Sequence, residues 1–204
     1  MKLVIIDTET TGLYGKDEVI QFAAIITDMN FRIERVVNFY CDTVHPINPK
    51  AQEVHKLSFK DIHELSGGRT FEDQFLEFKE SLNGEDLIWI EWSSSGFDMR
   101  MINQTLGKFG LEKYYFGKKT ASLNKKSGIF NFNLMHAIGN MFYNGKFRKL
   151  EIACNELLPV SADKISKLYE KYIKSYNVAT GAHHADYDAF LCYLLISRYG
   201  NKFV

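Results

Sequence analysis

Cysteine, proline and long apolar runs are scarce in this 204-residue sequence. The three cysteines, Cys41, Cys154 and Cys192, are odd in number and far apart, and no Cys-x-x-Cys or Cys/His zinc spacing occurs. This pattern argues against a disulfide framework and against a structural zinc site. An excess of charge is lacking too, because 25 basic residues balance 25 acidic ones. Domains that coat nucleic acid through bulk electrostatics are usually strongly basic, so that class is disfavoured.

The N-terminal apolar run, Leu3–Ile6, is shorter than a signal peptide requires, and no segment approaches the length of a membrane span. We therefore expect a reduced, cytoplasmic protein without a membrane partner. Hydrophobic residues make up 46% of the chain and charged residues 25%, which is typical of globular proteins. Because no linker or repeat divides the sequence, we expect residues 1–204 to form a single domain.

The order of strand-like and helical patterns predicts an α/β fold. A buried strand over 3–6 and two strand-like runs over 19–27 and 33–41, separated by polar turns, predict an antiparallel meander. Pro46 and Pro49 predict a loop over 44–50. The helical spacings and two further strand-like runs alternate after that, over 70–82, 87–90, 97–109, 129–134, 134–142, 149–158, 162–176 and 186–199. The sequence therefore predicts a mixed central sheet, a three-strand meander plus parallel strands, flanked by helices.

Two acids, Asp7 and Glu9, follow the first predicted strand within the segment Asp7–Leu13. Side chains alternate along a strand, so these two carboxylates project from one face. They repel each other unless a cation lies between them, and Mg²⁺ accepts carboxylate oxygens while keeping positions open for phosphate and water. An ordinary strand end with exposed acids is the alternative for a bare Asp-x-Glu, but the full heptapeptide argues against it.

Two later segments carry further candidate residues. Asp98 opens a predicted helix, where the helix dipole favours an acid, so a purely structural role stays open for it. His183 and Asp188 are five residues apart and would lie roughly 140° apart on a helix. They can converge only if His183 precedes the helix that carries Asp188. A capping or surface histidine is the alternative for His183.

The three segments, in this order, resemble the three exonuclease motifs of the DEDDh family, the DnaQ-like exonucleases with an RNase H-like fold. The resemblance spans nearly the whole chain. The acids that match the family motifs are Asp7, Glu9, Asp98 and Asp188. His183 matches the histidine of the H-x4-D spacing, whereas the tyrosine branch of the family would need a tyrosine where this chain has His184.

The resemblance implies a 3′-to-5′ exonuclease that hydrolyses the terminal phosphodiester bond of single-stranded DNA or RNA and releases nucleoside 5′-monophosphates. The four acids would hold two Mg²⁺ or Mn²⁺ ions, and His183 would act as the general base. Thr8, Thr11 and Leu13 would line the pocket for the terminal nucleotide. The segment Val54–Ser58 resembles a family segment that approaches the substrate end, which makes His55 a candidate contact.

The chain departs from the family pattern at Ser93-Ser94, where the family usually has His-Asn, so contacts that orient the substrate are expected to differ. The long segment 159–182 is rich in lysine and tyrosine and is predicted to affect substrate choice. Basic and aromatic residues that could grip a single strand, or form an ordinary solvated surface, are Lys108, Lys113, Lys118, Lys119, Lys125, Lys126, Lys146, Arg148 and Lys149, with Tyr114, Tyr115, Phe116, Phe130 and Phe132.

Three alternatives remain open from sequence. One is an RNA-trimming exoribonuclease, because the contact to the 2′-hydroxyl that separates RNA from DNA depends on geometry. Another is a non-catalytic module that binds nucleic acid, although all four acids and the histidine are present. The sequence also leaves open whether the chain is a free enzyme or a subunit of a polymerase or other complex. A nucleophile elbow and a P-loop are both excluded by their motif spacing.

Overall fold

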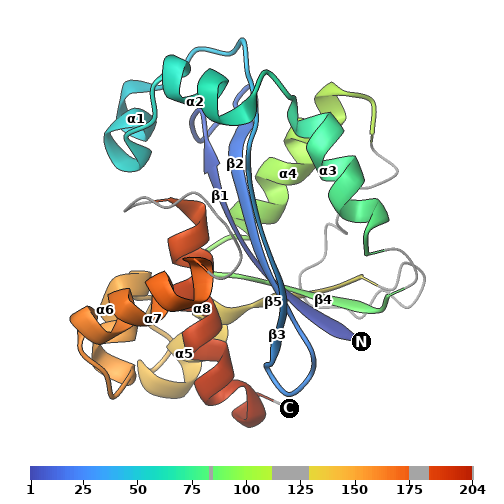
Figure 1. Cartoon of the computed structure of the whole chain (residues 1–204). Coiled ribbons are helices and arrows are strands. Elements are labelled where there is room, and N and C mark those ends of the chain that lie inside the picture. The colour runs from blue at the N-terminus through green and yellow to red at the C-terminus, as the bar shows by residue number, and fades with distance from the viewer. Residues whose placement is uncertain (83–84, 112–128, 175–183, 204) are drawn as a thin grey trace.

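The computed structural model describes residues 1–82, 85–111, 129–174 and 184–203. Its five-stranded sheet has the order β3-β2-β1-β4-β5. The strands are β1 Lys2–Thr10, β2 Val19–Thr27, β3 Ile33–Tyr40, β4 Leu87–Glu91 and β5 Ile129–Asn133. The first three strands form the predicted antiparallel meander, and β4 and β5 run parallel to β1. The mixed sheet predicted from the sequence is therefore confirmed (Figure 1).

Helices cover both faces of this sheet (Figure 1). They are α1 Pro49–His55, α2 Phe59–Ser66, α3 Phe71–Glu80, α4 Phe97–Lys108, α5 Leu134–Phe142, α6 Leu150–Leu157, α7 Ala162–Lys174 and α8 Ala185–Tyr199. None of the helices in the described part of the chain combines the length and apolar character of a transmembrane segment. The loop predicted over 44–50 is wrong at its end, because α1 begins at Pro49. Proline suits a first helical position, where its missing N–H has no intrahelical partner to lose, and the Asn48 side chain caps the helix.

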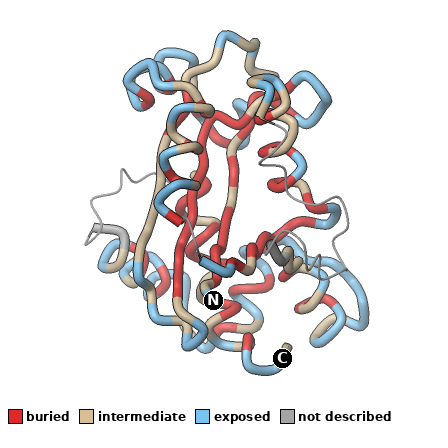
Figure 2. The backbone as a smooth tube through the Cα atoms, turned by 90° about the vertical axis from the view of Figure 1, so that its right-hand side faces the viewer, coloured by how far each residue is buried: buried red, intermediate tan, exposed pale blue. Residues whose placement is uncertain are grey.

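The alternation of side chains along β1 creates two apolar cores. Val4 and Ile6 pack on one face with residues of α3 and α4. Leu3 and Ile5 pack on the other face with residues of α5, α6, α7 and α8. The strands at the centre of the sheet are accordingly buried along most of their length (Figure 2). Because β1 is packed on both faces, its backbone is held rigidly, and this fixes the positions of the acids near its carboxyl end.

Candidate active site

The candidate acids come together where β1 ends beside the first turns of two helices. Asp7 and Glu9 lie on β1, Asp98 lies in the first turn of α4, and Asp188 lies in the first turn of α8. The helix α8 packs directly against β1 and β2, and α4 packs against β1 from the other face. Segments from the start, the middle and the end of the chain thus meet at one place.

Thr8 ties the second of these segments to the first. Its backbone N–H donates to Asp98 Oδ1 over 3.0 Å, and its hydroxyl donates to the same oxygen over 2.7 Å. Asp98 is itself buried. The family resemblance predicted Thr8 as a substrate contact. In the structure both of its donors hold Asp98, while the hydroxyl oxygen keeps its capacity to accept a hydrogen bond.

The four acids repel one another strongly. Burial raises the pKa of Asp7 well above its ordinary value, and Asp98, Asp188 and Glu9 raise it further. Burial likewise raises the pKa of Glu9, and the negative charges of Asp188 and Asp98 raise it further. The pKa of Asp98 is also raised by burial, although the hydrogen bonds from Thr8 act in the opposite direction. Each of the four carboxylates therefore lies within electrostatic reach of the others.

This donor set fits hard divalent cations. Carboxylate oxygens are the preferred ligands of Mg²⁺ and Mn²⁺. A bound cation would counter both the burial and the mutual repulsion that raise the pKa values of Asp7 and Glu9. Within the described ranges, no three His, Cys, Asp or Glu side chains already stand as a preformed ligand group. The evidence that the acids converge is the packing of α4 and α8 against β1 and the effect of each acid on the pKa values of the others.

The third motif is anchored to the sheet at the start of α8. The Ala185 N–H donates to Gln21 Oε1 over 3.2 Å, and Gln21 lies opposite Glu9 in the register of β1 and β2. Gln21 Nε2 donates to Asp186 Oδ1 over 3.2 Å, and the hydroxyl of Tyr169 on α7 donates to Asp186 Oδ2. The segment 159–182, predicted to affect substrate choice, thus contributes α7 to the support of the third motif.

The candidate general base His183 lies outside the described residues. Its neighbour His184 is extended, with φ −117° and ψ 149°, and α8 begins only at Ala185. The helix that carries Asp188 therefore begins after His184, and the convergence of His183 with Asp188 stays a prediction. The ring of His184 lies near β3, with its Nδ1 atom 3.4 Å from the Tyr40 hydroxyl.

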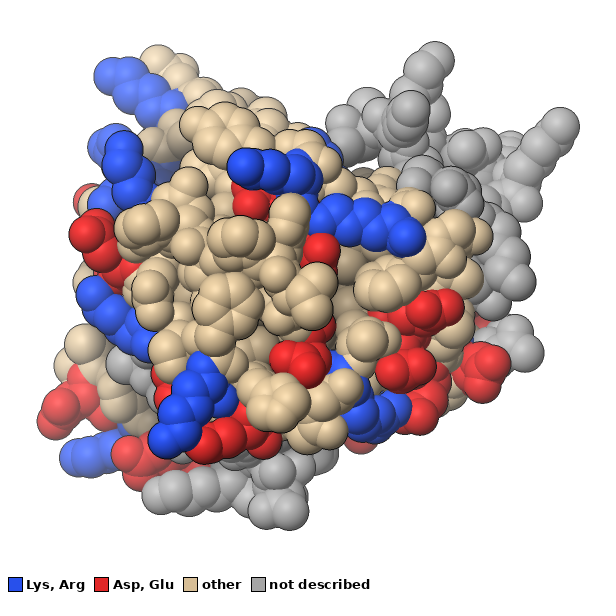
Figure 3. Space-filling model, turned by 90° about the horizontal axis from the view of Figure 1, so that it is seen from above, with Lys and Arg blue, Asp and Glu red and all other residues tan. Residues whose placement is uncertain are grey.

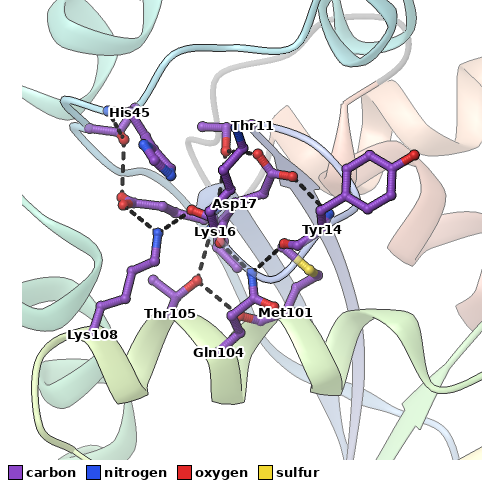
Figure 4. A network of polar contacts seen from close by, with 12 residues as sticks. Thr11, Tyr14, Lys16, Asp17, His45, Met101, Gln104, Thr105 and Lys108 are labelled. Atoms are coloured by element: carbon purple, nitrogen blue, oxygen red, sulfur yellow. Dashed lines mark hydrogen bonds and ion pairs between the residues drawn. The ribbon is translucent and has the colours of Figure 1, made fainter.

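The loop between β1 and β2 carries the other two predicted pocket residues, Thr11 and Leu13. The Thr11 hydroxyl donates to Asp17 Oδ1 over 3.1 Å, and the Tyr14 N–H donates to Asp17 Oδ2 over 2.7 Å (Figure 4). A Cβ on Gly12 would lie 2.6 Å from the same carboxylate, so a larger residue there would have to displace the Asp17 side chain. Leu13, in this turn, is 62% exposed.

Asp17 was not identified from the sequence, although it ends the polar turn after the first motif. It is buried, and by accepting the Tyr14 N–H it holds the backbone next to Leu13 in place. Gln104 of α4 secures the same turn by donating to the Tyr14 carbonyl over 2.7 Å (Figure 4). The helix that presents Asp98 therefore also braces the loop of the predicted nucleotide pocket.

His55, predicted as a weaker substrate contact, ends α1 and is only 1% exposed. Its Nδ1 accepts the Leu57 N–H over 3.0 Å, so the ring proton resides on Nε2. That Nε2 is buried and has no hydrogen-bond partner among the described residues. Burial, together with His184, lowers the pKa of His55 to about 4, which keeps the ring neutral. A buried donor without a partner beside His184 is suited to an incoming acceptor.

The basic residues considered for substrate grip divide into three groups. Lys108 forms an ion pair with Glu18 at 2.8 Å and is not free for a substrate. Exposed positions that the structure describes are Lys146, Arg148 and Lys149, around an exposed Phe147. The residues at 113–126 lie outside the described part. On the face shown in Figure 3, basic and acidic side chains are interspersed, which agrees with the zero net charge.

The five-stranded mixed sheet, with Asp7 and Glu9 on β1 and Asp98 and Asp188 in the first turns of α4 and α8, is the arrangement that an RNase H-like fold predicts. The family model described as Exonuclease, RNase_T, matches residues 4–196, and the chain belongs to this exonuclease family. The resemblance to DnaQ-like exonucleases is thereby confirmed.

Among curated proteins, the chain is similar to a DNA polymerase III of PolC type from Ureaplasma parvum serovar 3. The two are 28% identical over 189 residues, which cover 92% of this chain and 11% of that relative. The chain therefore spans about a tenth of the length of the polymerase that it matches.

Among solved structures, the chain is similar to E. coli exonuclease I. The complex with a dA16 oligonucleotide has a TM-score of 0.73 at 15% identity, over 98% of this chain and 41% of that chain. The zinc-bound complex with single-stranded DNA has a TM-score of 0.66 at 14% identity, over 98% of this chain and 40% of that chain. At such identities the likeness shows the fold alone.

Proposed function

We propose that residues 1–204 form one exonuclease domain that removes nucleotides from the 3′ end of single-stranded nucleic acid. One observation supports the proposal above all: four acids from three distant segments interact electrostatically with one another. They are Asp7, Glu9, Asp98 and Asp188. Asp98 is buried and the other three carboxylates are half-buried. Four such carboxylates at one spot destabilise a fold unless they bind a cation. Such a cluster in an exonuclease family is best explained as its reaction centre.

Two Mg²⁺ or Mn²⁺ ions bound there would neutralise the scissile phosphate and lower the pKa of the attacking water. The four acids supply the ligand oxygens, and Thr8 holds Asp98 in place through two hydrogen bonds. His183 takes the proton of the attacking water as general base. Leu13 contacts the terminal nucleotide, and His55 donates its Nε2 proton to an acceptor on it. The product is a nucleoside 5′-monophosphate.

We infer DNA as the main substrate, in the context of DNA replication or repair. The similar protein from U. parvum is named a DNA polymerase, and exonuclease I has been crystallised with oligodeoxynucleotides. Association with a polymerase is part of the proposal, because the similar segment belongs to a much longer polymerase chain.

The test is incubation with 3′- and 5′-labelled single-stranded DNA and RNA of one sequence, with Mg²⁺, Mn²⁺ or EDTA. We expect the 5′-labelled strand to shorten stepwise and the 3′-labelled strand to release labelled mononucleotide, both with metal only. Faster degradation of DNA than RNA would support the inferred substrate. Activity that persists in EDTA, or products that are long fragments from both labels, would contradict the proposal.

The variant His55→Asn tests the predicted contact at the nucleotide pocket. Asparagine Oδ1 can still accept the Leu57 N–H, but the donor at the Nε2 position is lost. One lost hydrogen bond of about 1–2 kcal/mol corresponds to a KM roughly 5- to 30-fold higher, with kcat nearly unchanged. Steady-state kinetics on a labelled oligonucleotide measure both constants. His63→Asn, at an exposed ring paired with Asp42, is the matched control. A folded His55→Asn variant with the wild-type KM would remove His55 from the substrate site.

A further inference from the structure

Glu91 is a fifth acid at the proposed site, and the sequence motifs assign it no role. It is the last residue of β4, it follows the apolar residues Leu87–Ile90, and it is only 1% exposed. The parallel pairing of β4 with β1 runs to Ile5 opposite Ile90, so Glu91 follows on β4 just as Ile6 and Asp7 follow on β1. Its charge contributes to the raised pKa of Asp7. A carboxyl group in such a position needs specific hydrogen-bond partners to be tolerated.

The partners of Glu91 are the first backbone donors of α4. Its Oε2 accepts the Asp98 N–H over 3.1 Å and the Met99 N–H over 3.3 Å. These N–H groups have no partner within the helix, because the first four donors of any α-helix are left over. A carboxylate at this point also interacts favourably with the helix dipole. Glu91 therefore caps α4 from the neighbouring strand.

The residues between β4 and α4 complete this cap. The N-cap residue is Gly96, with φ 71° and no side chain to offer. Ser93 Oγ accepts the remaining Phe97 N–H over 2.9 Å. Glu91 and Ser93 together thus serve the first three donors of the helix. Ser93 belongs to the Ser93-Ser94 pair, where the chain departs from the His-Asn pattern of the family.

Asp98 is consequently held from two sides. Its backbone N–H is fixed by Glu91 on β4, and its carboxylate is fixed by Thr8 on β1. Because the Glu91 oxygen that faces α4 is engaged by two backbone donors, Glu91 is placed to orient a ligand group and not to be one. A shift of the first turn of α4 would move the Asp98 carboxylate directly.

We propose that Glu91 is a positioning residue that sets the Asp98 carboxylate for cation binding by clamping the start of α4. The inference rests on the proposed function, since it takes Asp98 as a cation ligand. Supporting groups of this kind alter metal affinity or activity about 10- to 100-fold when they are removed.

The test compares Glu91→Leu with Glu91→Gln. Leucine removes the acceptor, whereas the glutamine amide oxygen can still accept both N–H groups. Mn²⁺ binding is measured by electron paramagnetic resonance, together with kcat and KM on single-stranded DNA and the melting temperature. We expect Glu91→Leu to bind Mn²⁺ at least about tenfold more weakly and to lower kcat about 10- to 100-fold, with KM nearly unchanged. Glu91→Gln should stay within about threefold of wild type, less than the roughly tenfold loss that removal of a supporting group causes.

A purely structural role would lower the melting temperature of Glu91→Leu but leave Mn²⁺ affinity and kcat at wild-type values, and that result would overturn the inference. If the leucine variant does not fold, Glu91→Asp carries the same test, because its shorter side chain draws the acceptor away from α4. A folded Glu91→Asp with wild-type Mn²⁺ affinity would also overturn it. Failure of the wild-type protein to bind Mn²⁺ would instead overturn the proposed function itself.

Discussion

Replacing Asp188 with asparagine should abolish nucleotide release and leave the protein folded. Asparagine preserves the size of the side chain but removes a negative charge and a strong ligand oxygen. Because metal stabilisation of transition-state charge contributes several kcal/mol, we expect a rate loss on the order of 10³-fold or more. The measurement is the initial rate of mononucleotide release at saturating Mg²⁺ and DNA.

The same variant should keep its fold because it relieves repulsion. Asp188 is among the charges that raise the pKa values of Asp7 and Glu9, so its neutralisation favours the cluster in the absence of cations. The melting temperature of the variant in EDTA should therefore be at least as high as that of wild type. The rise in melting temperature on adding Mn²⁺ should be smaller than in wild type. Asp163→Asn, an exposed acid in the first turn of α7, is the control and should keep full activity. An active Asp188→Asn variant would remove Asp188 from the ligand set.

Replacing His183 with alanine should slow the chemical step by roughly 10²- to 10⁴-fold, the usual scale for loss of a general base. Binding of the DNA end should change little, since the acids and Leu13 remain. Single-turnover rates at saturating Mg²⁺ measure the chemical step directly. The His63→Ala variant, at an exposed ring paired with Asp42, is the control and is expected to keep the wild-type rate.

A second substitution at the third motif separates the two adjacent histidines. His184 lies near the Tyr40 hydroxyl and helps to lower the pKa of His55, the proposed substrate contact. We therefore expect His184→Ala to raise KM more than it lowers the single-turnover rate. If the rate of His183→Ala equals that of wild type while His184→Ala is slow, the role of general base moves to His184. If neither variant is slow, the proton goes directly to solvent.

The supports of the site were harder to foresee than its acids. Glu91 follows an apolar strand and resembles an ordinary strand end in the sequence, yet its carboxylate caps α4. Asp17 lies in a polar turn like many others, yet it fixes the loop of Leu13. Thr8 was predicted as a substrate contact, and the sequence did not indicate that both of its donors hold Asp98. Each of these roles depends on a contact partner that the spacing of residues along the chain does not reveal.

What the sequence by itself determined are features with a local physical cause. Alternation along β1 places Asp7 and Glu9 on one face, and the first turn of a helix favours acids such as Asp98 and Asp188. The meander and the helical spacings follow from periodicity in the same way. Only the tertiary structure decided which groups meet within about 3 Å, the length of a hydrogen bond. Contacts at that distance are set by how the sheet and helices pack, and packing depends on the whole chain at once.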